Sequence, residues 1–126
     1  MTGFVGNIEE KTLANTNFRQ VLFTGKYAQL VVMSLKPSEE IGMEVHPNVD
    51  QFFRFEQSEG KVIINGEESI VGSGRAVIVP AGAQHNVINT STDKELKLYT
   101  IYSPPNHPDG TIHPTKADAM KAEKHE

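Results

Sequence analysis

Cysteine is absent from the sequence, and long apolar runs are absent as well. Without cysteine the chain cannot form disulfide bonds, an iron–sulfur cluster or a cysteine-ligated zinc finger, and it has no thiol nucleophile. This composition fits a reducing compartment, and we expect a cytoplasmic location. No apolar stretch approaches the roughly 20 residues that a membrane-spanning helix needs, and no basic start followed by an apolar segment indicates a signal peptide. We therefore expect no membrane association.

Positive charge is also scarce, because 12 Lys and Arg stand against 16 Asp and Glu and give a formal net charge of −4. A nucleic-acid surface needs clustered basic side chains, so no nucleic-acid partner is expected. The remaining composition is that of an ordinary globular protein, with 37% hydrophobic and 22% charged residues over 126 positions. This length and composition predict a single domain over residues 1–126.

The pattern that the chain shows most often is that of short strands. The apolar and aromatic segments are separated by turn residues such as Asn65-Gly66, a pair that favours a type I′ hairpin. The expected strands cover residues 27–35, 51–55, 61–64, 67–71, 75–79, 85–89 and 95–102. No helical period is visible before residue 115. Many short strands at near-regular spacing predict an all-β, antiparallel sandwich or barrel whose core covers residues 17–103.

The last part of the chain, residues 104–126, has a different composition. Four of the seven prolines lie between residues 103 and 114, so this segment is expected to form an extended arm without regular structure. Residues 115–126 are polar and rich in alanine, and they favour one or two helical turns. Thr115 and Asp118, three residues apart, resemble a capping box at the start of this helix.

With cysteine absent, the candidate metal ligands are His, Asp, Glu and amide oxygens. Of the five histidines, His46 and His85 lie at ends of expected strands, where a rigid frame can hold them. The other three, His107, His113 and His125, lie in the arm or the tail. We expect their positions to be poorly fixed and interpret them as outside any site.

Two segments bring the candidate ligands together. Glu44 and His46 are two residues apart and therefore project to the same face of a strand. Gln51 opens the next expected strand and can return to the same interior, and His85 follows a tight turn. Two imidazoles, one carboxylate and one amide oxygen suit a divalent first-row metal and leave positions open for water or substrate. The alternative is that these residues are ordinary polar groups, hydrogen-bonded inside the open end of a barrel.

The segment around His85 carries a recognisable motif. It reads as a glycine, five residues, Pro-x-Gly, two residues, His, three residues and Asn, and it resembles the second motif of the cupin superfamily in full. The matching positions are Gly74, Pro80, Gly82, His85 and Asn89. The glycines, the proline and Asn89 are interpreted as structural, because they form the turns that position His85.

The segment around His46 resembles the first cupin motif with three departures. Glu44 replaces the usual first His, Gln51 replaces the usual Glu, and Ser58 replaces the closing Gly. The chain is thus similar to small single-domain cupins over residues 34–102. The resemblance implies an antiparallel double-stranded β-helix, or jelly-roll barrel, with a short irregular or helical C-terminal arm.

The same resemblance implies one divalent transition metal at the open end of the barrel, one of Zn, Mn, Fe, Ni, Co or Cu. Its ligands by position would be His46, Gln51 and His85, with Glu44 as a carboxylate ligand. The resemblance also implies a homodimer, for which residues 21–23 and 51–55 are the expected contact segments.

Three functions remain open at this point, each with a small-molecule substrate or ligand. The first is a metal-dependent enzyme on a sugar-like substrate, similar to mannose-6-phosphate isomerase-like cupins. Glu44 is then the only evident carboxylate at the site, and no cluster of Lys and Arg is evident for a phosphate. The second is a non-haem dioxygenase, for which Glu44, His46 and His85 have the composition of a facial triad. The third is a non-catalytic barrel that binds a ligand or metal.

Overall fold

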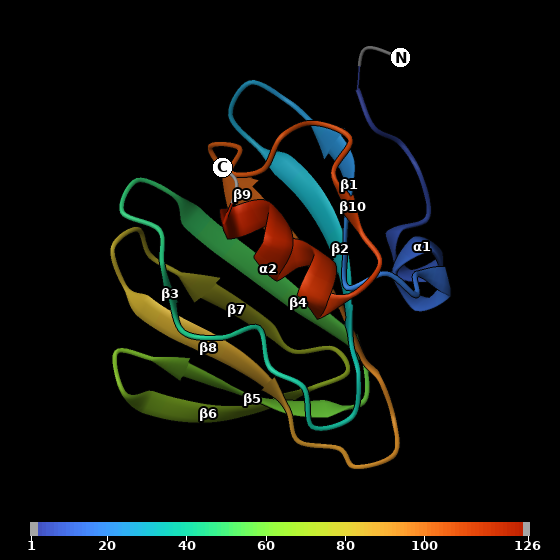
Figure 1. Cartoon of the computed structure of the whole chain (residues 1–126), viewed down its shortest axis with the longest axis vertical. Coiled ribbons are helices and arrows are strands. Elements are labelled where there is room, and N and C mark those ends of the chain that lie inside the picture. The colour runs from blue at the N-terminus through green and yellow to red at the C-terminus, as the bar shows by residue number, and fades with distance from the viewer. Residues whose placement is uncertain (1–2, 125–126) are drawn as a thin grey trace.

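A computed structural model describes residues 3–124, and His125 therefore lies outside the described residues. Two antiparallel sheets face each other and two helices flank them (Figure 1). The six-stranded sheet has the order β10 (Ile112–His113), β1 (Arg19–Thr24), β2 (Gln29–Leu35), β9 (Leu96–Ser103), β4 (Asp50–Gln57), β7 (Ala76–Val79). The four-stranded sheet has the order β3 (Glu44–Val45), β8 (Gln84–Asn89), β5 (Glu59–Ile64), β6 (Glu67–Gly72). This arrangement confirms the expected all-β jelly-roll fold.

All seven expected strands are present, with ends that differ from the prediction by no more than two residues. Asn65 and Gly66 both have positive φ, 48° and 83°, as a type I′ hairpin between β5 and β6 requires. In β9, side chains at every second position form one buried face. Its members Leu96, Leu98, Thr100 and Tyr102 are each at most 1% exposed.

The core lies between the two sheets. Its aromatic centre is Phe53 and Phe55, whose rings stack at 6.3 Å, and Val31, Met33 and Val87 close it from neighbouring strands. Each of these five side chains is at most 1% exposed. Because the sheets are antiparallel, the starts of β4 and β8 and the end of β9 meet at one end of the sandwich. That end carries the candidate site.

The prediction that no helix precedes residue 115 is wrong, because α1 spans Ile8–Ala14. The side chain of Asn7 caps it by accepting a hydrogen bond from the Glu10 amide at 3.1 Å, and Glu9 and Glu10 lie in the first turn. Thr12 is its buried residue. A helix of 7 residues is too short to show a clear hydrophobic period, so these capping residues are its only sequence signal.

The C-terminal arm contains one regular element that was not expected, since Ile112–His113 pairs with β1 as β10. Pro108 and Pro114 lie outside this two-residue strand, so its backbone donors remain available. The helix α2 (Lys116–Lys124) follows, and its predicted cap is confirmed: the Thr115 amide donates to the Asp118 carboxylate, and the Asp118 amide donates to the Thr115 hydroxyl.

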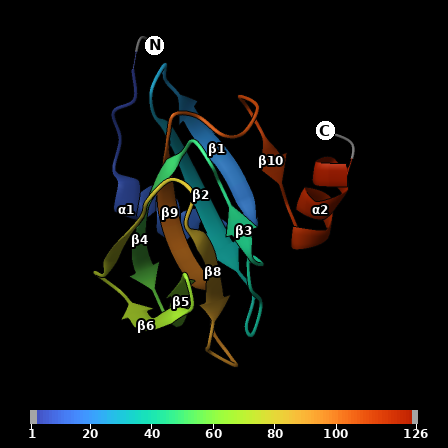
Figure 2. The same cartoon turned by 90° about the vertical axis from the view of Figure 1, so that its left-hand side faces the viewer.

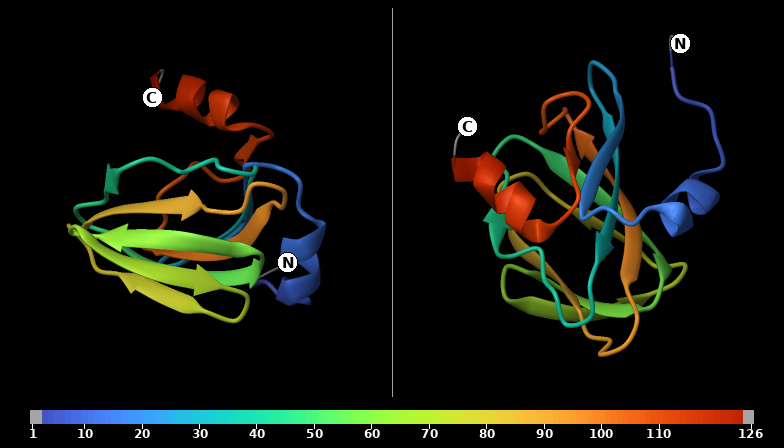
Figure 3. Two further views of the ribbon diagram at one scale, coloured as in Figure 1. Left: turned by 90° about the horizontal axis from the view of Figure 1, so that it is seen from below. Right: turned by 45° about the vertical axis from the view of Figure 1, so that its right-hand side comes forward.

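Figure 2 shows α2 outside the two sheets, beyond β10, and the left view of Figure 3 also shows this helix apart from the strands. Its anchor is Ala119, which is 2% exposed and belongs to the hydrophobic core cluster. Neither helix within residues 3–124 is long and apolar enough to cross a membrane.

Candidate metal centre

The segment that carries Glu44 and His46 is fastened to β8. The Gly42 amide donates to Oδ1 of Asn86 at 2.8 Å, and Gly42 has a φ of 108°, a backbone conformation that favours glycine. In the short strand β3 that follows, Glu44 lies directly opposite His85. Residues opposite each other share a face of the sheet. Glu44 and His85 are therefore neighbours through backbone pairing alone.

Three of the four predicted ligands converge. One ligand atom from each of Glu44, His46 and His85 can be chosen so that all three lie within 4.8 Å of one another. The Glu44 carboxylate is 2.9 Å from Nε2 of His46, and the rings of His46 and His85 have centroids 5.4 Å apart. Ligands bound at about 2.1 Å to one ion lie roughly 3–4 Å apart. The spacing and the oxygen–nitrogen donor set therefore fit a divalent transition metal.

The hydrogen bond of His85 orients its ring for such a role. Nδ1 lies 3.1 Å from the carbonyl oxygen of Ala83, which can only accept, so Nδ1 carries the proton. Nε2 then keeps its lone pair for the interior. A backbone carbonyl that fixes the tautomer in this way is the usual support of a metal-binding histidine.

Glu44 is held in its charged form. Burial opposes ionisation, but the hydrogen bond with His46 and the electrostatic effects of His46, Arg19 and His85 outweigh it and lower the pKa of Glu44 below its ordinary value. A carboxylate that is ionised at neutral pH needs no proton release before it binds a cation.

Gln51 faces the interior from the start of β4 and is 2% exposed. Its Nε2 donates to the hydroxyl of Thr100 at 3.0 Å, so Oε1 points away from Thr100. Within residues 3–124, Oε1 has no hydrogen-bond partner of normal geometry although it is buried. Phe53 lies two residues after Gln51 on β4 and therefore on the same face of the strand. Its ring is 6.3 Å from that of His85. A buried amide oxygen without a well-formed hydrogen bond is consistent with a fourth ligand, and this role of Gln51 stays a prediction.

The interpretation of His107 as poorly fixed and outside the site is wrong. The buried Gln29 side chain clamps the arm: Oε1 accepts from the amides of Asn106 and His107 at 3.1 and 3.0 Å, and Nε2 donates to the His107 carbonyl at 2.7 Å. Nε2 of His107 is 3.2 Å from the Tyr102 hydroxyl. The arm therefore contributes a well-placed imidazole to the site.

Burial and the charge of Arg19 lower the pKa of His107 to about 3, so the ring is neutral at neutral pH. Burial also raises the pKa of Tyr102 to about 12. The ring of Tyr102 stands 5.9 Å from that of His46. His107 and Tyr102 are thus two neutral polar groups next to the candidate ligands.

Arg19 is the other residue that sequence reasoning did not identify. It is 2% exposed at the start of β1, and its Nη1 lies 3.4 Å from Nδ1 of His113. His113, on β10, is likewise in contact with the interior rather than loosely placed. Neither Arg19 nor His113 belongs to a sequence motif. Only the pairing of β10 with β1 brings the two residues together.

A cavity of about 320 Å³ opens beside these groups. Its lining residues are Glu44, Val45, His46, Asn106, His107 and Glu123. Val45 and Met43, the sequence neighbours of Glu44, are about half exposed. The arm and α2 therefore form one wall of the entrance and the segment around β3 forms the other.

Two further residues have structural roles. Asp50 is exposed, and its carboxylate accepts from the Ala81 amide at 2.8 Å, which fixes the turn before His85. Asn89, as expected, is structural, because its side-chain amide donates to the carbonyls of Leu35, Lys36 and Lys94.

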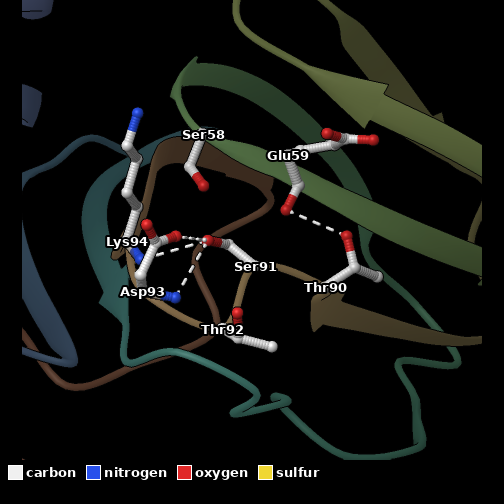
Figure 4. A pocket seen from close by; sticks show the side chains of 7 residues that line it. All are labelled: Ser58, Glu59, Thr90, Ser91, Thr92, Asp93 and Lys94. Atoms are coloured by element: carbon white, nitrogen blue, oxygen red, sulfur yellow. Dashed lines mark hydrogen bonds between the residues drawn. The ribbon is translucent and has the colours of Figure 1, made fainter.

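A larger cavity, about 670 Å³, lies at the opposite end of the sandwich, and Figure 4 shows the residues that line it. It lies between the turn after β4 and the loop from β8 to β9. Its polar groups satisfy one another: Ser91 Oγ donates to Asp93 and accepts from the Lys94 amide, and Thr90 donates to the Glu59 carbonyl. It holds none of the candidate ligands, so it is not the site.

Comparison with known proteins agrees with this geometry. Residues 31–102, more than half of the chain, match the family described as Cupin domain. The uncharacterized protein YrkC of Bacillus subtilis (strain 168) is 52% identical over 95% of this chain and 67% of that protein. The uncharacterized protein L612 of Acanthamoeba polyphaga mimivirus is 42% identical over 86% of this chain and 70% of that protein.

Among solved structures, the crystal structure of BH2720 from Bacillus halodurans is 45% identical and superposes with a TM-score of 0.91. The superposition covers 94% of this chain and 93% of that one. None of these three names states an activity, so the reaction has to be inferred from the site. The motifs, the fold and the family match agree, and the chain belongs to the cupin domain family as a small cupin.

Proposed function

We propose that this cupin binds one divalent transition metal through Glu44, His46, Gln51 and His85 and acts as a metal-dependent enzyme on a small polar substrate. The observation that carries the proposal is the convergence of Glu44, His46 and His85 within 4.8 Å. Two of these residues also line a cavity of about 320 Å³, which is at the lower end of the size of small-molecule sites.

The metal, when bound, would supply a Lewis acid that polarises oxygen atoms of the substrate. The residues of the chain divide the remaining tasks. Glu44, His46 and His85 hold the ion, and the carbonyl of Ala83 orients His85. His107 lines the cavity, lies outside the ligand set and stays neutral, so it can accept a hydrogen bond from a substrate.

An isomerase-like reaction is the finer proposal. It needs a proton-accepting group that is not itself a ligand, and Glu44 cannot easily have both roles. His107 lies at the cavity outside the ligand set, but its pKa of about 3 makes it a weak base, so it supports a hydrogen bond to a substrate oxygen and not the proton transfer. A sugar-like molecule with vicinal oxygens would then be held beside His107.

The second candidate is a non-haem dioxygenase. Two histidines and one carboxylate, His46, His85 and Glu44, have the composition of the facial triad that binds iron and leaves open positions for dioxygen and a chelating substrate. The identity of the metal separates the two candidates.

The test is metal analysis of the untagged protein purified under several conditions. We expect about one metal ion per chain, and none in His46→Ala or His85→Ala. Met43→Ala is the matched control, because Met43 lies in the same segment with its side chain turned outward, and this variant should keep the metal. His46→Ala should also abolish turnover of a substrate once one is identified.

The metal content then distinguishes the functions. Iron favours the dioxygenase, and zinc or manganese favours the isomerase. A wild-type protein without metal under every condition would contradict both proposals and favour a barrel that binds a ligand without catalysis. Retention of metal by His46→Ala would contradict the assigned ligand set.

We further propose that the protein forms a homodimer through the outer face of the six-stranded sheet. An apolar stripe crosses this face in register, each member opposite the next: Phe23, Leu30, Ile101, Phe52 and Ile78. Of the predicted contact segment 51–55, Phe53 and Phe55 are buried in the core and cannot contribute.

Light scattering on wild type, Ile78→Glu and Ile70→Glu tests the dimer. Ile78 and Ile70 are 67% and 76% exposed, but Ile70 lies on the four-stranded sheet. We expect a dimer that Ile78→Glu weakens and Ile70→Glu preserves. A monomeric wild type would end the proposal.

A further inference from the structure

Arg19 is a buried cation with no carboxylate at ion-pair distance among residues 3–124. Its side chain is 2% exposed, and it lies opposite the core residue Met33 on β2. Within residues 3–124 its Nε has no hydrogen-bond partner, and the contact of Nη1 with His113 is long, at 3.4 Å. No carboxylate in that part of the chain forms an ion pair with it. A buried charge is costly unless it is paired and hydrogen-bonded, so this guanidinium has capacity for a further acceptor.

The charge of Arg19 acts on the candidate site. It lowers the pKa of His107, which lines the cavity and whose Nε2 is 3.2 Å from the Tyr102 hydroxyl. It also contacts the hydroxyl of Tyr102, whose ring is 5.9 Å from His46. Arg19 therefore lies behind the cavity, close to the ions and dipoles that a bound molecule would meet.

The charges of the site do not balance for a neutral ligand. A divalent metal and Arg19 together carry three positive charges, and Glu44 supplies one negative charge. Gln51, His85 and His107 add none when they are neutral. A neutral sugar would leave two positive charges uncompensated in a buried setting, whereas an anion that binds the metal and reaches Arg19 would reduce them.

We propose that Arg19 binds the carboxylate of a small organic acid that occupies the cavity beside Glu44 and His46. This inference rests on the proposed metal site and names the class of its ligand, a small organic acid in place of the neutral sugar-like molecule of the isomerase proposal. Arg19 is one monovalent cation with a planar fork that matches a carboxylate. The cavity wall also carries the acidic Glu123, and none of the described lining residues is a Lys or Arg, so Arg19 behind the wall is the cation that a ligand could reach. One cation next to acidic walls suits a carboxylate better than a phosphate dianion, which usually gathers several donors.

The chain has three arginines, Arg19, Arg54 and Arg75, which makes a direct measurement practical. In nitrogen-15-labelled protein each gives one Nε–H signal in NMR spectra. Arg54→Gln and Arg75→Gln assign two of the signals by deletion and leave Arg19 intact. Arg54 pairs with Glu56 at 2.9 Å and serves as the internal control for general charge effects.

The spectra are recorded during titration with malonate, inorganic phosphate and propane-1,2-diol, in the zinc-loaded and in the metal-free protein. We expect malonate to shift the Arg19 signal saturably in at least one form, with Arg54 and Arg75 unchanged. Propanediol should have no effect and phosphate a weaker one. In Arg19→Gln the affinity for malonate should fall roughly tenfold or more, as for a lost hydrogen bond to a charged group.

Three results would overturn the proposal. They are an Arg19 signal that malonate never shifts, equal shifts of all three arginines, and tighter binding of phosphate than of malonate. The wild-type titration decides the question even where Arg19→Gln does not fold. Zinc stoichiometry, measured on the same samples, distinguishes failure of this inference from failure of the proposed metal site. Zinc without malonate binding at Arg19 contradicts the inference alone, and malonate binding without zinc contradicts the metal site alone.

Discussion

Two exchanges of side chains set the charge of the candidate site. Relative to the cupin motif that it resembles, the chain has Glu44 in place of a histidine and Gln51 in place of a glutamate. The first exchange adds a negative charge and the second removes one, so the ligand set keeps a single carboxylate. The carboxylate has moved from the six-stranded sheet to the short strand β3, where it faces His85 directly.

The role of Gln51 is testable by restoring the usual residue. Gln51→Glu should bind the metal at least about tenfold more tightly, equal to about 1.4 kcal/mol, because a carboxylate replaces a neutral oxygen. The affinity should also fall more steeply at low pH, since burial raises the pKa of the new carboxyl group. Calorimetric titration with Zn²⁺ at several pH values measures both effects. Gln57→Glu, at the far end of the same strand, is the control, and an unchanged affinity in Gln51→Glu would show that residue 51 is not a ligand.

The low pKa of His107 predicts that the stability of the metal-free protein depends on pH. Its pKa is about 3 in the folded chain and about 6.5 in the unfolded chain, so folding excludes a proton. This contribution to stability is complete above pH 6.5 and is lost as the pH falls toward 3. The loss amounts to at most about 2 kcal/mol between pH 6.5 and pH 5.

Urea unfolding of wild type and His107→Phe across this range isolates the contribution. The phenyl ring keeps the packing against Tyr102 but does not titrate. The stability difference between the two proteins should shrink or reverse in favour of the variant as the pH falls. A difference that is the same at every pH would contradict the low pKa of His107.

At the scale of elements, the turn from β4 to β5 explains why the first cupin motif usually ends in glycine. Ser58 occupies that position with a φ of 74°, a conformation in which glycine is usual and other residues are strained. Gly60, two residues later, has a different constraint. A Cβ there would lie 2.7 Å from the Ile88 carbonyl oxygen and 2.9 Å from a methyl group of Leu96. Sheet packing rather than backbone conformation therefore requires glycine at residue 60.

Two alanine substitutions separate these causes. Gly60→Ala should destabilise the fold by about 1–3 kcal/mol, because the methyl group meets backbone that cannot move away. Gly66→Ala introduces no contact within 4 Å but keeps a φ of 83°, so it should cost about 1 kcal/mol. Denaturant midpoints at constant m value measure both costs. A Gly60→Ala variant as stable as wild type would contradict the close approach of β5 and β8.

At the scale of the whole molecule, the candidate ligands connect the two sheets. Glu44 and His85 belong to the four-stranded sheet, His46 follows β3, and Gln51 belongs to the six-stranded sheet. An ion bound by all four would link the sheets at their open end. Binding should therefore stabilise the entire fold and not one element.

Thermal unfolding with and without metal tests this coupling. Free Zn²⁺ or Mn²⁺ at 100 times its dissociation constant should add about 2.7 kcal/mol and raise the Tm by roughly 10 °C. A chelator should reverse the shift. His85→Ala should show no shift, and Met43→Ala should show the wild-type shift. An equal shift in His85→Ala would place the bound metal elsewhere.

The local part of this structure could be predicted from the order of residues. Strand alternation, the Asn65-Gly66 hairpin and the capping pair Thr115 and Asp118 depend on neighbours within a few positions, and the structure confirms each. The pairing of Glu44 with His46 on one face follows from the same rule. The helix α1 was not predicted because its 7 residues are too few to show a hydrophobic period.

Only the tertiary structure decided which residues that are distant in the sequence lie next to one another at the site. Gln29 fastens the arm through three hydrogen bonds to Asn106 and His107, and this contact between residues 77 and 78 positions apart brings an imidazole to the cavity. Arg19 reaches the same interior through the packing of β1 against β2 and β10. Such contacts leave no local pattern, because they depend on how distant strands pair and on which polar groups a closed sandwich leaves buried together.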